Sequence, residues 1–168
     1  DLRDYRVVER QPLRIGLAGG RELITAPPPS AGGIALAQSL LMLQELPWQK
    51  AGAVQRSHYV VEVLRRAYRD RGLLGDPDQV RNPLPQLLDP DYLERLAKGI
   101  ALQHATPSTS LPPAPGWREG DHTTHFTVLD TEGNAVAATL SINLPFGAAF
   151  TAPGTGVLLN NEMDDFAA

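Results

Sequence analysis

The feature that most constrains this chain is a pair of strand-like stretches joined by a short turn in its last third. Residues 123–130 alternate apolar and polar side chains, as a half-buried strand does. Residues 131–134 have the composition of a turn, and residues 135–143 return as a mostly apolar strand. With the turn centred near Gly133, an antiparallel return brings positions 141–143 opposite the start of the first strand, with the register left open. The sequence therefore predicts a β-hairpin that gathers polar side chains at its open end.

Thr123 stands at the start of this hairpin, directly after a run rich in Pro, Ser, Thr, Ala and Gly. Cleavage of the peptide bond between His122 and Thr123 would leave the threonine hydroxyl beside its own free α-amine. One residue would then hold both a nucleophile and a base. The preceding linker, residues 105–122, is predicted to be mobile, which suits self-cleavage but is also what its composition predicts without any cleavage.

Motifs on both sides of the hairpin match one family of enzymes in order and spacing. Downstream they are Thr123-Thr124-His125, Gly133-Asn134, Ser141-Ile142-Asn143, Phe146-Gly147 and the run from Leu158 to Phe166. Upstream they include Pro27-Pro28-Pro29-Ser30, Gly32-Gly33, Asp70-Arg71 and Gly75-Asp76-Pro77. Over essentially its whole length, the chain resembles the γ-glutamyltranspeptidase family of N-terminal nucleophile hydrolases.

The resemblance implies roles for two hydroxyl side chains. Thr123 is similar to the family's nucleophile, which is exposed when the precursor cleaves itself into a large and a small subunit, here between His122 and Thr123. Ser141 is similar to a second threonine, which hydrogen-bonds the nucleophile's amine. Serine keeps the hydroxyl but loses the methyl group, so its rotamer is less restricted.

Charge along the chain agrees with a site that binds an ammonium group. The resemblance assigns Asn143, Glu162 and Asp165 to the α-amino end of a γ-glutamyl group, and carboxylates bind ammonium in any case. Residues 123–168 hold five acids and no Lys or Arg, whereas the first 122 residues hold 14 acids and all 15 bases. Without the ordered match, a solvated acidic loop would be the preferred interpretation of this acidic group.

Two parts of the family's site have no counterpart in these 168 residues. In the family, the arginine that binds the substrate carboxylate lies upstream of this sequence, and the oxyanion-hole glycines lie beyond its end. We therefore expect an internal piece of a longer protein, with residues 1–122 ending the large subunit and residues 123–168 beginning the small one. Loss of oxyanion donors costs about two to three orders of magnitude in turnover, so we expect little turnover from this piece alone.

The resemblance implies that the parent protein is a γ-glutamyltransferase and glutathione hydrolase. A glutathione-type donor would acylate Thr123, and the acyl group would pass to water, an amino acid or a peptide, with no cofactor. A rival function within the superfamily is a glutaryl acylase acting on a β-lactam; a glutaryl group lacks the α-ammonium, so Glu162 and Asp165 favour the γ-glutamyl donor. From another class, a noncatalytic structural fragment also remains open.

Composition excludes several other classes of protein. A net charge of −4 and the lack of a basic block argue against nonspecific nucleic-acid binding. The sequence has no apolar run of membrane-spanning length, and zero cysteines exclude disulfides and thiolate metal sites. His122 and His125 lack a third ligand for zinc, so no metal is expected.

Partners would be the γ-glutamyl substrate and the remaining subunit segments, and the resemblance implies a periplasmic or extracellular location.

The coarse pattern predicts an α+β fold, with helices in the first half and strands around Thr123. Strands are expected at residues 13–17 and 22–25 about a turn at 18–20. The resemblance implies a four-layer α-β-β-α sandwich with antiparallel sheets. A sheet edge left uncovered invites pairing with another chain, so we expect self-association.

Three helices are expected in the first half. The first follows a Ser30 cap, and the third starts at an Asp89 cap with Pro90 at its first position. The second spans about residues 54–71, with Val60, Val63 or Leu64, and Ala67 buried. Its arginines, Arg65, Arg66 and Arg69, are expected to face water.

Overall fold

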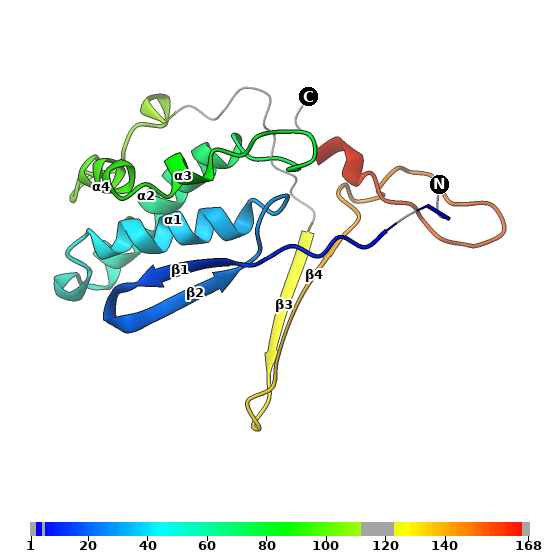
Figure 1. The fold of residues 1–168 in the computed structure, drawn as a ribbon, viewed down its shortest axis with the longest axis horizontal. Helices are drawn as coiled ribbons and strands as arrows, with labels where there is room; N and C mark the ends of the chain where they lie inside the picture. Colours follow the sequence, from blue (N-terminus) through cyan, green and yellow to red (C-terminus); the bar gives the residue numbers. More distant parts are fainter. Residues whose placement is uncertain (1–2, 5, 112–122, 166–168) are drawn as a thin grey trace. The chain divides into compact units, whose positions relative to one another are not determined.

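The computed structural model describes residues 3–4, 6–111 and 123–165 (Figure 1). The chain divides into two compact units, Asp1–Pro115 and Gly116–Ala168. The first unit contains β1 (Leu13–Leu17), η1 (Ala18–Gly20), β2 (Arg21–Thr25), α1 (Gly32–Gln44), η2 (Trp48–Lys50), α2 (Ala53–Arg71), α3 (Leu84–Leu87), α4 (Pro90–Lys98) and η3 (Ser108–Ser110). The second contains β3 (Thr123–Leu129), β4 (Ala135–Ser141) and η4 (Glu162–Asp165). Helices with antiparallel strand pairs make the chain α+β, as predicted.

The first unit is built around α1, which contacts β1, α2, α3 and α4 (Figure 1). The helix can be surrounded in this way because small residues on several of its sides let neighbouring elements approach. At Gly33 an added Cβ would lie 2.1 Å from the Ala26 carbonyl oxygen. Gly33 therefore serves close packing at the helix start, where any larger residue would collide with the backbone.

The core of the first unit lies where α1, α2 and α4 meet. Its buried residues are Ala35, Met42, Leu46, Ala51, Tyr59, Val63, Ala67, Leu93, Ala97 and Ile100. Val63 and Ala67 are buried on α2, as predicted, whereas Val60 is half-buried and Leu64 is exposed. Hydrophobic side chains thus hold the three helices together in the usual way.

The prediction that Arg66 faces water is wrong. Its side chain is 4% exposed and forms an ion pair with Glu62, with Nη1 2.6 Å from Glu62 Oε2. Its Nε donates to the Leu96 carbonyl and its Nη2 to the Gly99 carbonyl. These carbonyls lie at the C-terminus of α4, where no helical N–H group is available to them. The guanidinium is buried because it satisfies this helix end.

Asp70 forms a second buried polar cluster at the end of α2. It accepts hydrogen bonds from Gln38, Arg69 and the Tyr92 hydroxyl, and Arg69 is only partly exposed. The prediction that Arg69 faces water is therefore corrected, because its guanidinium pairs with the buried Asp70 carboxylate. Burial, reinforced by the neighbouring Asp70 carboxylate, raises the pKa of Tyr92 to about 12.

The predicted N-terminal cap is present on α4 but not on α1. Asp89 accepts a hydrogen bond from the Tyr92 amide at 2.8 Å, and Pro90 occupies the first turn of α4, as expected. At the start of α1 the N-cap is Ala31 and makes no side-chain cap, so Ser30 does not cap the helix. The short helix α3 has no counterpart among the predicted elements.

In the second unit, β3 and β4 form an antiparallel hairpin in which Thr123 pairs with Ser141 and Leu129 with Ala135. Asp130 closes the turn by accepting hydrogen bonds from the side chain and amide of Asn134 and from the Glu132 amide. The Asn134 side chain is the main reason that the pKa of the Asp130 carboxyl is lowered. The hairpin confirms the prediction, and its register is now defined.

The second strand is shorter than predicted. It ends at Ser141 rather than Asn143, because Asn143 has a φ of 68°, in the left-handed region, and leaves the extended conformation. The chain then loops out, forms a single antiparallel bridge between Thr151 and Leu158, and returns to η4. Among the residues described, no helix is both long and apolar enough to span a membrane.

Candidate active site

Thr123 is the first residue of β3 and is exposed. Its hydroxyl donates a hydrogen bond to the hydroxyl of Ser141, with 3.1 Å between the two oxygens. The contact arises because the hairpin register places the first residue of β3 opposite the last residue of β4. The two hydroxyl residues singled out in the sequence are therefore brought together.

Asn143 is linked to the same hydroxyl through its backbone. Its amide donates to Ser141 Oγ at 3.0 Å, and its side-chain Nδ2 donates to the Asn161 carbonyl at 2.9 Å. The residue is 7% exposed, which is unusual in this unit. Asn143 therefore connects the open end of the hairpin to the segment that carries the predicted carboxylates.

Glu162 begins η4, and its amide donates to Asn160 Oδ1 at 3.0 Å. Its Oε1 atom is buried and has no hydrogen-bond partner among the described residues. A buried acceptor without a donor is costly, so this oxygen is suited to a donor group brought by a ligand. Asp165 ends the same 3-10 turn, and only its backbone is described.

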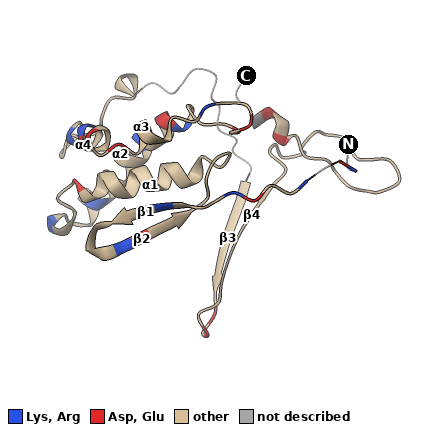
Figure 2. Ribbon diagram, in the orientation of Figure 1, with Lys and Arg blue, Asp and Glu red and all other residues tan. Residues whose placement is uncertain are grey.

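The charge of this unit has one sign throughout the part that the structure describes. Figure 2 shows acidic residues on the hairpin turn and on η4, and no Lys or Arg in β3, β4 or the loop after them. Such a segment attracts a cationic group. Within the described residues no cluster of three or more His, Cys, Asp or Glu side chains is arranged to hold a metal ion. His122, the other side of the predicted cleavage site, lies outside the described residues.

His125 lies on the same face of the hairpin as Thr123, two residues further along β3. Its Nδ1 atom is 2.8 Å from the Thr139 hydroxyl and its Nε2 atom 3.3 Å from the Thr127 hydroxyl. Both ring nitrogens are therefore occupied by threonine side chains. The period-two alternation already puts these residues on one face, but the sequence does not reveal the contact.

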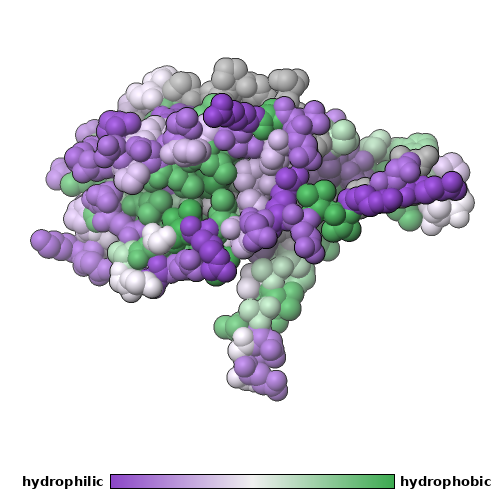
Figure 3. All heavy atoms as spheres, in the orientation of Figure 1, coloured by the Kyte–Doolittle hydropathy of each residue, from purple (hydrophilic) through white to green (hydrophobic). Residues whose placement is uncertain are grey.

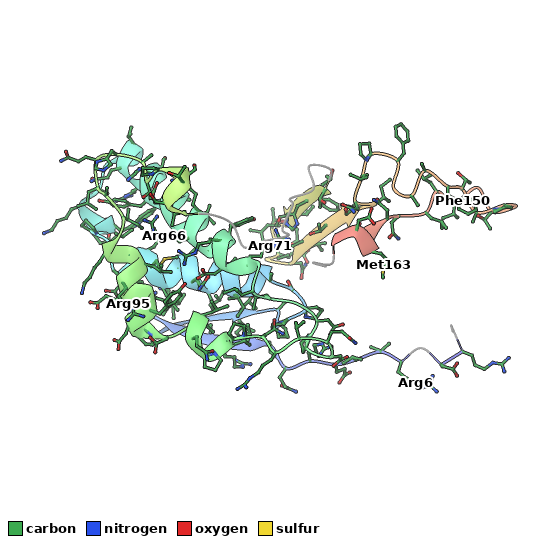
Figure 4. The ribbon with its side chains drawn as sticks, turned by 90° about the horizontal axis from the view of Figure 1, so that it is seen from above. Arg6, Arg66, Arg71, Arg95, Phe150 and Met163 are labelled. Carbon is green, nitrogen blue, oxygen red and sulfur yellow. The ribbon has the colours of Figure 1, made fainter. Side chains whose placement is uncertain are left out.

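Asn161 was part of the matched motif, yet the sequence indicated no role for it. In the structure it contacts the residues that follow β4 and also Asp164 within η4. Figure 4 shows this short helical turn with its labelled residue Met163. Its side chain is half-buried. A pattern of single residues along the chain contains no signal for such a bridge between separate segments.

The model of one protein family, described as Gamma-glutamyltranspeptidase, matches residues 1–168. The chain belongs to the γ-glutamyltranspeptidase family. The resemblance predicted from the motifs is thereby confirmed. The roles of the individual site residues remain predictions, because family membership alone does not test them.

Relatives in the γ-glutamyltranspeptidase family include both hydrolases and acylases. The chain is 42% identical to the glutathione hydrolase proenzyme of Pseudomonas sp. strain A14, and 40% identical to that of Escherichia coli K12. It is 38% identical to the acylase ACY 1 proenzyme of Pseudomonas sp. strain V22. The alignments cover 99–100% of this chain, which spans about 30% of the length of these relatives.

Two solved structures of γ-glutamyltranspeptidases have a similar fold. One, from Pseudomonas nitroreducens in complex with L-DON, is 32% identical, with a TM-score of 0.60 over 67% of this chain and 35% of that one. The other, from Helicobacter pylori, is 32% identical, with a TM-score of 0.61 over 72% of this chain and 36% of that one. These similarities agree with the α+β fold class.

Proposed function

We propose that the protein containing this chain transfers and hydrolyses γ-glutamyl groups through an ester on Thr123. The observation that carries the proposal is the hydrogen bond between the hydroxyls of Thr123 and Ser141 at the open end of the hairpin. An N-terminal threonine needs a neighbour that orients its hydroxyl and its free amine, and Ser141 supplies that neighbour. The donor would be glutathione or a similar γ-glutamyl compound.

The proposed reaction begins with self-cleavage. The Thr123 hydroxyl attacks the carbonyl carbon of His122, and the acyl group moves from nitrogen to oxygen, which frees the Thr123 amine. Water then hydrolyses the ester and releases the Thr123 hydroxyl and the His122 carboxylate. Residues 1–122 then end the large subunit and residues 123–168 begin the small one. The maturation step requires no cofactor.

In turnover, the freed amine of Thr123 acts as general base. It takes the proton of the Thr123 hydroxyl as the oxygen attacks the γ-carbonyl carbon of the donor, and it passes that proton to the leaving amine. Water or an acceptor amine then attacks the ester and releases Thr123. Segments of the longer protein would supply the carboxylate-binding arginine and the oxyanion donors.

Substrate recognition rests on Asn143, Glu162 and Asp165. The unpartnered, buried Oε1 atom of Glu162 favours a donor with an α-ammonium group over a glutaryl donor, which has none. Because one of the relatives is an acylase, hydrolysis of a glutaryl group is retained as the alternative function. We also propose a periplasmic or extracellular location for the mature protein.

The first experiment follows the mass of the natural full-length protein that contains this sequence, together with its γ-glutamyl anilide hydrolysis. We expect a subunit that begins at Thr123, and neither cleavage nor turnover in Thr123→Ala. Ser141→Ala should slow turnover about 10-fold to 100-fold because it loses one hydrogen bond at the nucleophile, while Ser141→Thr retains most of it.

Intact-mass measurement of the 168-residue chain shows whether the residues around Thr123 suffice for cleavage without the rest of the protein. Cleavage before residue 123 in Thr123→Ala, or undiminished turnover by that variant, would refute the assignment of the nucleophile. Faster hydrolysis of a glutaryl anilide than of a γ-glutamyl anilide would instead favour the acylase.

A further inference from the structure

Asn161 uses all of its polar groups to join two segments of the second unit. Its Oδ1 accepts from the Leu144 amide at 3.1 Å, and its Nδ2 donates to Asp164 Oδ2 at 2.7 Å. Its carbonyl accepts from Asn143 Nδ2 at 2.9 Å and from the Asp164 amide at 3.0 Å, and its amide donates to the Ile142 carbonyl at 3.4 Å. Asn161 therefore bridges residues 142–144 and η4.

Hydrogen bonds, rather than hydrophobic packing, hold this region in place. Asn143 and Gly147 are the only buried residues that the structure describes between positions 123 and 164. Apolar side chains nearby, such as Leu144 and Met163, are 45% and 76% exposed. A polar bridge contributes most to positioning where few apolar contacts compete with it.

The two segments that Asn161 joins each carry predicted substrate-binding residues. Asn143 follows β4 and lies next to Ser141, while Glu162 and Asp165 belong to η4. A ligand ammonium group held by both segments needs their spacing to be constant. Both polar atoms of the Asn161 side chain, Oδ1 and Nδ2, take part in the bridge.

We propose that Asn161 is a positioning residue for the α-ammonium end of the substrate. It acts through Asn143 and Glu162 by keeping residues 142–144 and η4 at one spacing. The inference rests on the proposed γ-glutamyl function and deepens it. Its consequence is selective: loss of the bridge weakens recognition of the ammonium group more than it weakens the chemistry at Thr123.

Three variants test whether the hydrogen bonds of the Asn161 side chain, and not its size alone, are required. Asn161→Ala removes both side-chain bonds. Asn161→Asp keeps an acceptor for the Leu144 amide but sets a carboxylate against that of Asp164, so like charges repel. Combining Asn161→Asp with Asp164→Asn restores the bond in reverse, because the new amide at 164 donates to the new carboxylate at 161.

Asn82→Ala is a matched control in the first unit. Asn82 also bridges a loop through both ends of its amide, accepting from the Gly75 amide at 2.9 Å and donating to the Gly75 carbonyl at 3.0 Å. Its loss removes these two bonds and a longer one to the Val80 carbonyl at 3.5 Å, all of them within the first unit. The control measures how far a general loss of stability alters donor selectivity.

The test measures kcat and KM for a γ-glutamyl anilide and a glutaryl anilide in the natural full-length protein. We expect each single Asn161 variant to raise KM for the γ-glutamyl anilide about 10-fold, with a smaller change in kcat and little change for the glutaryl anilide. The double variant should return to within about threefold of wild type. Asn82→Ala should leave the ratio between the two donors unchanged.

Equal losses for both donors, or an unchanged KM for the γ-glutamyl anilide, would overturn the role of Asn161. Intact masses and thermal melting of every variant identify those that fail to mature or fold. If a single variant fails in this way, recovery of the γ-glutamyl KM in the double variant tests the role of the bridge. The proposed function has separate controls in the same series. A wild type that does not prefer the γ-glutamyl anilide, or an active Thr123→Ala, would refute that function whatever the Asn161 variants do.

Discussion

Glu62 is an ionised residue in an almost fully buried position, with 1% of its side chain exposed. Burial by itself would raise its pKa, but hydrogen bonds from Thr106 and Arg66 outweigh burial and lower the pKa from 4.5 to about 2. The carboxylate also accepts from Arg65, so that two arginines and the backbone of a distant segment meet at one side chain. Glu62 therefore anchors residue 106 to α2.

This shift makes the stability of the first unit depend on pH. Because the folded-state pKa is lowered, the contribution of Glu62 is complete above pH 4.5 and is lost as the pH falls toward 2. A shift of this size corresponds to about 3 kcal/mol. Urea unfolding of the 168-residue chain at several pH values should show that Glu62→Gln is less stable at pH 7 and loses less stability on acidification.

Glu94→Gln is the control for that measurement. Glu94 pairs with Lys98 at 2.8 Å, also four residues apart on a helix, but both side chains are substantially exposed. Such a pair contributes about 0.3 to 0.5 kcal/mol. A Glu62→Gln variant that unfolds with the same pH dependence as wild type would show that Glu62 does not carry the acid sensitivity.

At the scale of elements, the start of α1 is held against the connection from β2 by a contact that only glycine permits. A Cβ at Gly33 would lie 2.1 Å from the Ala26 carbonyl oxygen and 2.9 Å from Thr25 Oγ1. The first of these atoms belongs to the backbone and cannot rotate away. At the adjacent Gly32, the nearest atom to an added Cβ is Ser30 Oγ at 3.7 Å, an ordinary contact.

Two neighbouring glycines therefore predict opposite effects. Gly33→Ala should lower the free energy of unfolding by about 1 to 3 kcal/mol because the backbone must shift to admit the methyl group. Gly32→Ala should be neutral or should raise it by up to about 1 kcal/mol, since alanine favours the helix. Chemical denaturation monitored by circular dichroism measures both; equal effects at the two positions would contradict the packing explanation.

At the scale of the whole molecule, the two units differ in what covers their apolar side chains. The hydrophobic core described above lies entirely in the first unit. In the second unit, Phe126, Val128 and Leu140 on the hairpin are 46%, 55% and 57% exposed, and Figure 3 shows hydrophobic residues along its surface. Exposed apolar strands with unpaired edges associate readily with other chains.

We therefore expect the 168-residue chain to self-associate through residues 123–168. Sedimentation velocity over a range of concentrations should show growing assemblies for the whole chain and a monomer for residues 1–111. The physical reason is that residues 1–111 retain the buried core, whereas the hairpin strands have none of their own. A monodisperse monomer of the 168-residue chain would contradict this expectation.

Local patterns were sufficient to predict the elements around the site. The period-two alternation and the turn near Gly133 predicted the hairpin, and its polar open end placed Ser141 near Thr123. Asp89 with Pro90 likewise predicted the start of α4. These features depend on residues close in sequence, whose backbone preferences act before any tertiary contact forms.

Tertiary structure alone decided the remaining features. Arg66 is buried because it donates to the carbonyls of Leu96 and Gly99, which have no helical N–H partner. Those residues are about 30 positions away in the chain. Asn161 forms a bridge only because the fold brings it beside residues 142–144. β4 ends early because Asn143 leaves the extended conformation and contacts the Asn161 carbonyl. The sequence by itself determined the main helices, the hairpin and the family of the chain. The buried polar contacts needed the fold, since their partners are specified by position in space and not by spacing along the chain.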